Sequence, residues 1–195
     1  MRGILLRGGD GVNFDRLMAE GIRFAVLSAT AGKDRITPHF YENASAARRA
    51  GMTVAVYHDL EAATMADALA EAEHFRRVLF SLDAPPLWAM CRVESPFLPR
   101  NRQTLSCMTG VFLEKIRGLG YRPMLYTTED FLKTRLAPRT SFDLCLARWS
   151  VPEANALVRN PRIWEYGEGK AGDIPHAILL RGYFPISAGN PAGIF

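Results

Sequence analysis

The sequence predicts an α/β fold, a single TIM-like (β/α) barrel of about eight strands with helices mainly between the first five. The strand patterns are short, continuous apolar runs, which is typical of strands covered on both faces. Strand and helix patterns alternate along most of the 195 residues, and such units imply right-handed crossovers. The helix patterns thin out in the last third, which favours a barrel with an irregular end over the alternative, an open doubly wound sheet. No linker or change of composition divides the chain, so we expect residues 1–195 to form one domain.

The first half of the chain repeats a strand pattern followed by a helix pattern three times. Glycine or proline marks several of the boundaries, because both residues interrupt helices and strands. Gly21 and Gly51 end the first two helix patterns, and Pro38 begins the second. The strands are expected at residues 4–6, 24–27 and 53–57, and the helices at residues 14–20, 38–50 and 63–82.

Two more units follow, and then strands without long helices between them. Pro85 and Pro86 separate the longest helix pattern from the fourth strand, and Gly120 ends the next helix pattern. The fourth and fifth strands are expected at residues 87–91 and 123–126, their helices at 103–119 and 129–136, and the last three strands at 144–147, 162–166 and 177–180. Active sites of such barrels lie at the C-terminal ends of the strands, so the residues that follow each strand are the candidates for chemistry.

The composition argues against several classes of partner. The formal net charge is +4, and the arginines are scattered, without the block of like charges that indicates a nucleic-acid-binding tail. No apolar run approaches the roughly 18 residues that predict a membrane span. The apolar stretch near the N-terminus is too short for a signal peptide. We therefore expect synthesis in the cytoplasm, with access to a cell wall only through lysis or a dedicated delivery route.

The cysteines and histidines do not predict a metal or redox site. Cys91, Cys107 and Cys145 are odd in number and form no CxxC pair, and their apolar surroundings indicate buried free thiols. The four histidines show no ligand spacing, so we expect no metal. No P-loop or GxGxxG motif is present, and we expect no cofactor.

Several motifs stand in one order along nearly the whole chain. The most specific runs from Ala50-Gly51 to the end of a strand at Tyr57-His58. The others are Gly3-Ile4, Gly21-Ile22-Arg23-Phe24-Ala25, Gly120-Tyr121-Arg122-Pro123 with Leu125-Tyr126-Thr127, and Trp164-Glu165-Tyr166. Together they resemble glycoside hydrolase family 25, the Chalaropsis-type lysozymes or N-acetylmuramidases. The resemblance implies the same kind of barrel and an action on peptidoglycan.

The sequence departs from this family at the catalytic carboxylates. The family has an aspartate on the first strand, where this chain has Leu5. It has Asp-x-Glu on the fourth strand, where this chain has Arg92-Val93-Glu94. It also has an aspartate on the last strand, at about the position of Leu180. Of the family's catalytic carboxylates, this sequence therefore keeps Glu94 alone.

We expect Arg92 to disable Glu94 as a proton donor. Residues two apart on a strand point to the same side, about 6.6 Å apart. At an effective dielectric constant of about 20, two opposite unit charges at that distance attract by roughly 2.5 kcal/mol. The arginine thus favours the ionised carboxylate, and an ionised carboxylate cannot act as a general acid. The alternative is a strand-end salt bridge with no further role.

Other residues near strand ends are candidates for supporting roles. The carboxylates that could substitute for a lost one are Asp10, Asp59 and Glu165. The aromatic residues that could bind substrate by stacking on sugar rings are Tyr57, Tyr126 and Trp164, and Trp149 and Tyr166 lie near further strand ends. For the carboxylates the alternative is a solvated or hydrogen-bonding role, and for the aromatic residues it is packing in the core.

Three functions are compatible with these residues. The first is a catalytically inactive or strongly impaired lysozyme-like protein that binds glycan or only provides a scaffold. The second is an active peptidoglycan muramidase, with Glu94 as general acid and a relocated second carboxylate. The third is a structural component of a phage tail or a secretion machine. The corresponding partners are peptidoglycan or a related glycan, or a protein of such an assembly, and the fold alone does not decide among them.

Overall fold

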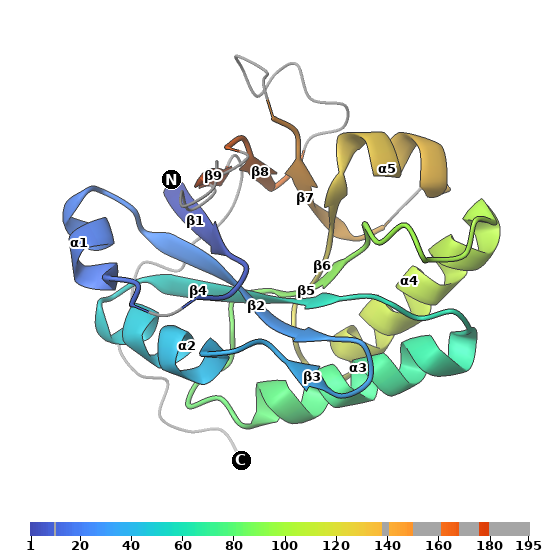
Figure 1. Cartoon of the computed structure of the whole chain (residues 1–195), viewed down its shortest axis with the longest axis horizontal. Coiled ribbons are helices and arrows are strands. Elements are labelled where there is room, and N and C mark those ends of the chain that lie inside the picture. The colour runs from blue at the N-terminus through green and yellow to red at the C-terminus, as the bar shows by residue number, and fades with distance from the viewer. Residues whose placement is uncertain (10, 138–140, 150–160, 168–175, 180–195) are drawn as a thin grey trace.

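The computed structural model describes residues 1–9, 11–137, 141–149, 161–167 and 176–179, and its central feature is a closed barrel of eight strands (Figure 1). Around the barrel the order is β1 (Arg2–Leu6), β9 (His176–Leu179), β8 (Ile163–Glu165), β7 (Asp143–Ala147), β6 (Pro123–Thr128), β5 (Ala89–Arg92), β4 (Thr53–Asp59) and β2 (Phe24–Ala31). The ring closes because β1 pairs with both β9 and β2. The predicted barrel is confirmed, and the alternative of an open sheet is wrong.

The strand directions follow the sequence pattern with one departure. Seven barrel strands run parallel to one another, as their continuous apolar runs predict. The eighth, β9, runs antiparallel to both β8 and β1. Outside the ring, a short strand β3 (Arg35–Ile36) pairs antiparallel with the end of β2. The barrel is therefore closed by an antiparallel strand rather than by a further strand–helix unit.

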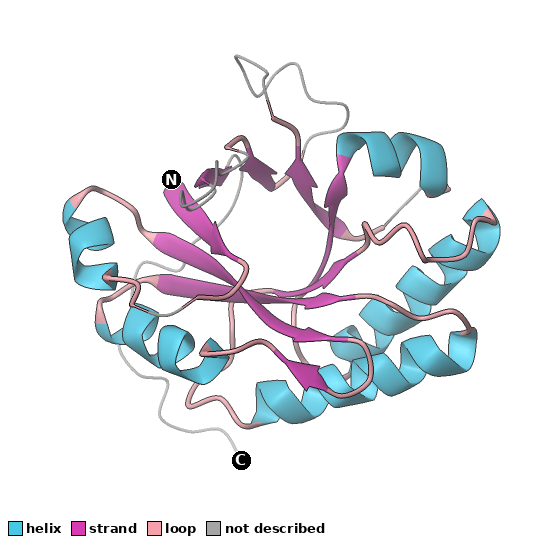
Figure 2. Ribbon diagram, viewed as in Figure 1, coloured by secondary structure: helices cyan, strands magenta, loops and turns pink. Residues whose placement is uncertain are grey.

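Five helices in the described residues follow the first five barrel strands of the chain (Figure 2): α1 (Phe14–Ala19), α2 (Phe40–Arg49), α3 (Met65–Phe80), α4 (Arg102–Gly118) and α5 (Glu129–Arg135). Local signals set where they begin. The hydroxyl of Thr64 accepts a hydrogen bond from the Asp67 N–H, and the Asp67 carboxylate accepts one from the Thr64 N–H. This capping box begins α3. None of these helices is both long and apolar enough to cross a membrane.

Side chains on the strands alternate between two buried layers. Ile4 and Leu6 on β1 point towards the helices, whereas Leu5 points into the barrel. The interior layer includes Leu5, Phe24, Val26, Tyr57, Trp88, Met90, Met124, Tyr126 and Ile163. Gly3 makes room for the Phe24 ring there, because a Cβ atom at Gly3 would lie 2.4 Å from it. The barrel is thus a packed core, and chemistry is confined to its rim.

The three cysteines are free, but they are not all buried. Cys91 and Cys145 lie on β5 and β7 and are buried, as predicted. Cys107 is exposed on α4, so the prediction is wrong for this residue. The buried stripe of α4 contains Leu105, Met108 and Phe112, and Cys107 falls off it.

Candidate functional site

The candidate site is the rim at which the parallel strands end. Five of its charged side chains come from the ends of four strands, and we call this cluster the barrel mouth: Arg7, Asp59, Arg92, Glu94 and Glu165. Strand alternation explains the cluster, because Leu5, Tyr57 and Met90 fill the interior two residues before Arg7, Asp59 and Arg92. An apolar and aromatic floor therefore lies beneath a charged rim.

Arg92 lies at the centre of the mouth. Its guanidinium donates a 2.8 Å hydrogen bond to Asp59 Oδ1 and a second hydrogen bond to Glu94 Oε2. The same guanidinium lies over two aromatic rings, 5.9 Å from the centroid of Tyr57 and 5.5 Å from that of Tyr126. Burial opposes its charge, but the carboxylates of Asp59 and Glu94 and the phenol of Tyr126 raise the pKa of Arg92 above its ordinary value. Arg92 is thus a fixed cation that bridges two carboxylates.

A second group of charges lies beside the first. Glu165 is fully buried and accepts hydrogen bonds from Arg7 Nη2 at 3.0 Å and from the Tyr126 hydroxyl at 2.6 Å. Burial and the nearby Glu165 carboxylate raise the pKa of Tyr126, so its hydroxyl stays protonated and acts as the donor. Tyr126 joins the two groups, since its ring lies beneath Arg92 and its hydroxyl contacts Glu165.

The structure brings together four of the residues that the sequence analysis singled out for catalysis or its loss. Arg92, Glu94 and Asp59 are in direct contact, and Leu5 is buried in the interior layer below them. Glu165 belongs to the same mouth but contacts Arg7 and Tyr126 instead. Asp10 and Leu180 lie outside the described residues. Whether any of these side chains takes part in catalysis stays a prediction.

The three aromatic residues predicted to bind sugar are all buried. Tyr57 and Tyr126 pack edge to face inside the barrel, with ring centroids 5.4 Å apart. The Trp164 indole donates a 2.9 Å hydrogen bond to the Arg148 carbonyl. These contacts fit the alternative of core packing, and in this conformation Arg92 lies over both tyrosine rings. Trp149 and Tyr166 are only half-buried and are better placed at the rim.

A pocket beside the mouth was not predicted from the sequence. This cavity of about 300 Å³ lies where β6 and β7 end and is lined by Glu129, Lys133, Arg148 and Trp149 among others. Glu129 is buried and pairs with Lys133 at 2.9 Å and Arg148 at 2.7 Å. The Trp149 Nε1 atom is buried and has no hydrogen-bond partner among the residues that the structure describes. The signal was present, since Arg148 directly follows the predicted strand at residues 144–147 and Glu129 begins the predicted helix just after the strand at residues 123–126.

His58 points away from the mouth, into the layer between the barrel and α3. Its Nε2 atom lies 2.8 Å from Glu71 Oε2, and its Nδ1 atom lies 2.8 Å from the Thr30 hydroxyl. Burial lowers the pKa of His58, so the ring is neutral. It donates to Glu71 and accepts from Thr30. Among the described residues, no three His, Cys, Asp or Glu side chains are grouped so that they could hold a metal ion.

Comparison with known proteins identifies a family and a fold. The sequence profile of glycosyl hydrolases family 25 matches residues 8–173. No curated protein matches the chain in sequence. Three similar solved structures are the CTP1L endolysin, a family 25 glycosyl hydrolase from Bacillus anthracis and a GH25 lysozyme from Aspergillus fumigatus.

These structures share the fold at low sequence identity. For the endolysin the TM-score is 0.80 at 17% identity, covering 91% of this chain and 66% of that one. For the Bacillus anthracis protein the TM-score is 0.76 at 19% identity, covering 93% and 89%. For the Aspergillus fumigatus lysozyme it is 0.76 at 20% identity, covering 90% and 91%. The chain spans just under two thirds of the endolysin and most of the other two.

Proposed function

Since this chain belongs to glycosyl hydrolase family 25, we propose that it is a lysozyme-like barrel that has lost efficient hydrolysis of peptidoglycan and retains glycan binding. Glycoside hydrolysis needs a carboxylic acid that protonates the leaving oxygen. It also needs a second carboxylate that stabilises or orients the group at the reacting carbon. Both requirements bear on the charges of the barrel mouth.

The observation that carries the proposal is the position of Arg92 between Asp59 and Glu94. Glu94 is the family carboxylate that the sequence keeps, and its direct partner is an arginine where the family has an aspartate. A neighbouring carboxylate would favour the protonated form of Glu94, whereas a neighbouring guanidinium favours the ionised form. Leu5 adds an apolar side chain at another catalytic position. The mouth therefore lacks a ready proton donor.

One arrangement supports a competing function, an active muramidase. Asp59 and Glu94 are each a little over a quarter exposed, and both contact the same guanidinium. If substrate displaced Arg92, two carboxylates would face one another at the rim. Asp59 would then be the relocated second carboxylate, with Glu94 as general acid.

A wall-lysis assay separates the two functions. Purified peptidoglycan would be incubated with the wild type, Glu94→Gln and Asp59→Asn, and released muropeptides would be quantified beside an active family 25 lysozyme. We expect release at the level of the buffer control for all three proteins. Clear release of muropeptides by the wild type that Glu94→Gln abolishes would overturn the proposal. If Asp59→Asn also loses that release relative to the wild type, the competing mechanism is identified.

The proposed binding surface is the pocket beside the mouth. Sugar sites combine an aromatic ring with a few fixed polar groups. Trp149 supplies a half-buried ring whose indole N–H has no partner in the described part of the chain, and Glu129 and Arg148 supply charged groups in the same pocket. The orphaned N–H favours a ligand with hydroxyl acceptors, because a buried donor without a partner is costly.

Sedimentation with insoluble peptidoglycan tests the binding. We expect the wild type to co-sediment and Trp149→Phe, which removes only the N–H and part of the ring, to bind several-fold more weakly. Phe80→Ala is the matched control, since Phe80 is an exposed aromatic residue at the end of α3. If the wild type stays in the supernatant, the glycan-binding part fails and a scaffold role in a phage or secretion assembly becomes the better explanation.

A further inference from the structure

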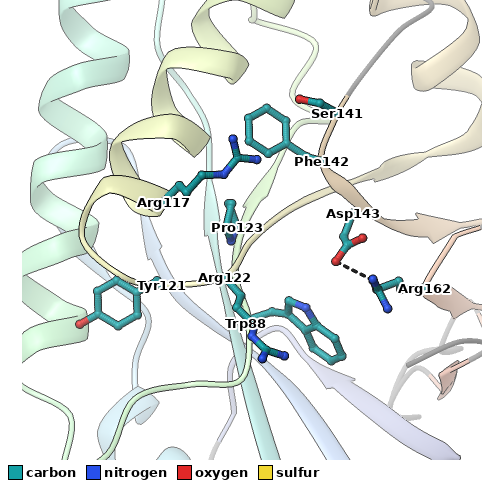
Figure 3. Close-up of a pocket in the computed structure, with 9 residues that line it drawn as sticks. All are labelled: Trp88, Arg117, Tyr121, Arg122, Pro123, Ser141, Phe142, Asp143 and Arg162. Atoms are coloured by element: carbon teal, nitrogen blue, oxygen red, sulfur yellow. Dashed lines mark ion pairs between the residues drawn. The ribbon is translucent and has the colours of Figure 1, made fainter. Parts of the chain in front are cut away.

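A second cavity lies at the opposite end of the barrel, where β5, β6 and β7 begin. Its volume is about 540 Å³, within the range of small-molecule sites. It is lined by residues at the start of these strands, including Trp88, Pro123 and Asp143 (Figure 3). The family's catalytic groups belong to the other end of the strands, so this cavity has no part in the hydrolytic site.

Three arginines from three separate segments line this cavity, and their guanidinium groups lie on different sides of it (Figure 3). Arg117 is in the last turn of α4, Arg122 directly precedes β6, and Arg162 directly precedes β8. Two of them already have partners. Arg117 pairs with Glu114 at 2.7 Å and lies over the Phe142 ring at 4.7 Å, while Arg162 pairs with Asp143.

The charges of the cavity leave a net excess of one positive charge. Two of the three guanidinium groups pair with carboxylates, Arg117 with Glu114 and Arg162 with Asp143, which leaves one positive charge unmatched. A guanidinium carries five N–H donors, so an arginine with one carboxylate partner keeps donors for a ligand. Arg122 is exposed and is the cation least committed to the protein, because its side chain makes no hydrogen bond or ion pair among the described residues.

The walls of the cavity determine what kind of anion fits. Trp88 and Phe142 supply aromatic surface next to the arginines (Figure 3). A planar carboxylate is satisfied by a single bidentate arginine. Arginines that approach from three elements match instead the tetrahedral oxygens of a phosphate, which accept from several directions. The remaining volume and the rings can hold a small organic group attached to that phosphate.

We propose that this cavity is a binding site for a phosphate ester, with Arg117, Arg122 and Arg162 around the phosphate and the aromatic walls against its organic part. The site is independent of the proposed function, since it shares no residue with the barrel mouth or the pocket beside it. Two kinds of ligand carry this chemistry, a free phosphate monoester and one unit of a polyol-phosphate polymer.

Calorimetric titration of the full chain at low salt tests the site. The probes are glycerol 3-phosphate as monoester, bis(glycero)phosphate as diester, and glycerate as a carboxylate of similar size. We expect saturable binding of at least one phosphate ester and binding of glycerate at least tenfold weaker. The ester that binds more tightly identifies the source. Equal affinity for glycerate, or no binding of either ester, would overturn the proposal.

Two charge reversals show whether the cavity itself is responsible. Arg122→Glu should weaken ester binding at least tenfold, while circular dichroism and the melting temperature stay near those of the wild type because Arg122 is exposed. Arg100→Glu is the matched control, an exposed arginine at the other end of the barrel that changes net charge equally and does not line the cavity. Equal weakening by both variants would mean diffuse attraction to a basic protein and would refute the site.

Discussion

Arg92 lies directly opposite Asp59 on adjacent parallel strands and donates a 2.8 Å hydrogen bond to it. The pairing register of β4 and β5 therefore fixes the contact, and no loop movement is needed to form it. The two side chains are mostly shielded from water, with Arg92 17% and Asp59 29% exposed. An ion pair held in this way resists opening by a substrate, and several measurable effects follow from it.

Removal of Arg92 should destabilise the protein at neutral pH. Arg92→Ala leaves Asp59 and Glu94 close together without their shared cation, and such loss of one partner from a shielded pair costs about 1–3 kcal/mol in the free energy of unfolding. Urea unfolding would measure the change. Arg16→Ala is the control, because Arg16 on α1 and Glu20 just after it form an exposed pair that should contribute less than about 0.5 kcal/mol. Equal losses for the two variants would show that the Arg92 contacts contribute no more than a surface pair.

Restoring the family aspartate on β1 should be costly by itself. Leu5 is fully buried among apolar side chains, so Leu5→Asp places a carboxylate where water cannot reach it. We expect a loss of about 2–4 kcal/mol from desolvation and lost packing. Leu5→Met keeps the volume and should cost less than about 1.5 kcal/mol. Thermal and urea unfolding of both variants would test this, and a well-tolerated Leu5→Asp would mean that the interior has retained a place for the charge.

Hydrolysis should return only when several carboxylates are restored together. Arg92→Asp removes the cation beside Glu94, yet two further family positions, Leu5 and Leu180, would still lack a carboxylate. We expect no muropeptide release from Arg92→Asp and measurable release from a Leu5→Asp, Arg92→Asp, Leu180→Asp triple variant that folds. Adding Glu94→Gln to the triple variant should abolish that release. Activity in Arg92→Asp alone would show that this cation is the main block.

The buried Glu165 allows a test of charge pairing without catalysis. Arg7→Ala leaves a fully buried carboxylate with only the Tyr126 hydroxyl, so we expect a loss of about 2–4 kcal/mol. Glu165→Gln removes the buried charge and still accepts from Tyr126, so the loss should stay below about 1 kcal/mol. The double variant should then be more stable than Arg7→Ala. If Glu165→Gln proves the more damaging change, the negative charge itself stabilises the rim.

His58 should make stability fall in mild acid. Burial lowers the pKa of His58 in the folded protein, whereas the unfolded histidine titrates near its ordinary value of 6.5. Below that pH the unfolded state binds more protons, so the free energy of unfolding decreases as pH falls, by up to about 1.4 kcal/mol per pH unit. Above it the contribution is fully present. Urea unfolding between about pH 7 and about pH 5 would measure the slope, and His58→Gln should flatten it.

More of the fold than of the candidate site could be predicted from the sequence. Apolar runs and glycine or proline boundaries predicted the strands and the five helices, because burial on both strand faces leaves a clear pattern, and the family resemblance added support for a barrel over an open sheet. The antiparallel direction of β9 leaves no such pattern, since a short buried strand has the same composition in either direction. The contact of Arg92 with Glu94 followed from strand alternation, but Asp59 was anticipated only as an isolated substitute. Its bond to Arg92 depends on the register between two strands, which no local sequence signal specifies. The cavity lined by Arg117, Arg122 and Arg162 brings together residues 88, 117, 122 and 162. It could not be predicted from the sequence, because these residues are far apart along the chain.

The pairing of β1 with β9 also constrains the order in which the chain can fold. Residues 2–4 find one neighbour early, on β2, but the other only after residues 176–178 have emerged from the ribosome. Until then β1 and β8 present two unpaired edges, which are the usual starting points for strand exchange and aggregation. The barrel therefore stays open between β1 and β8 until β9 is added as the closing seam.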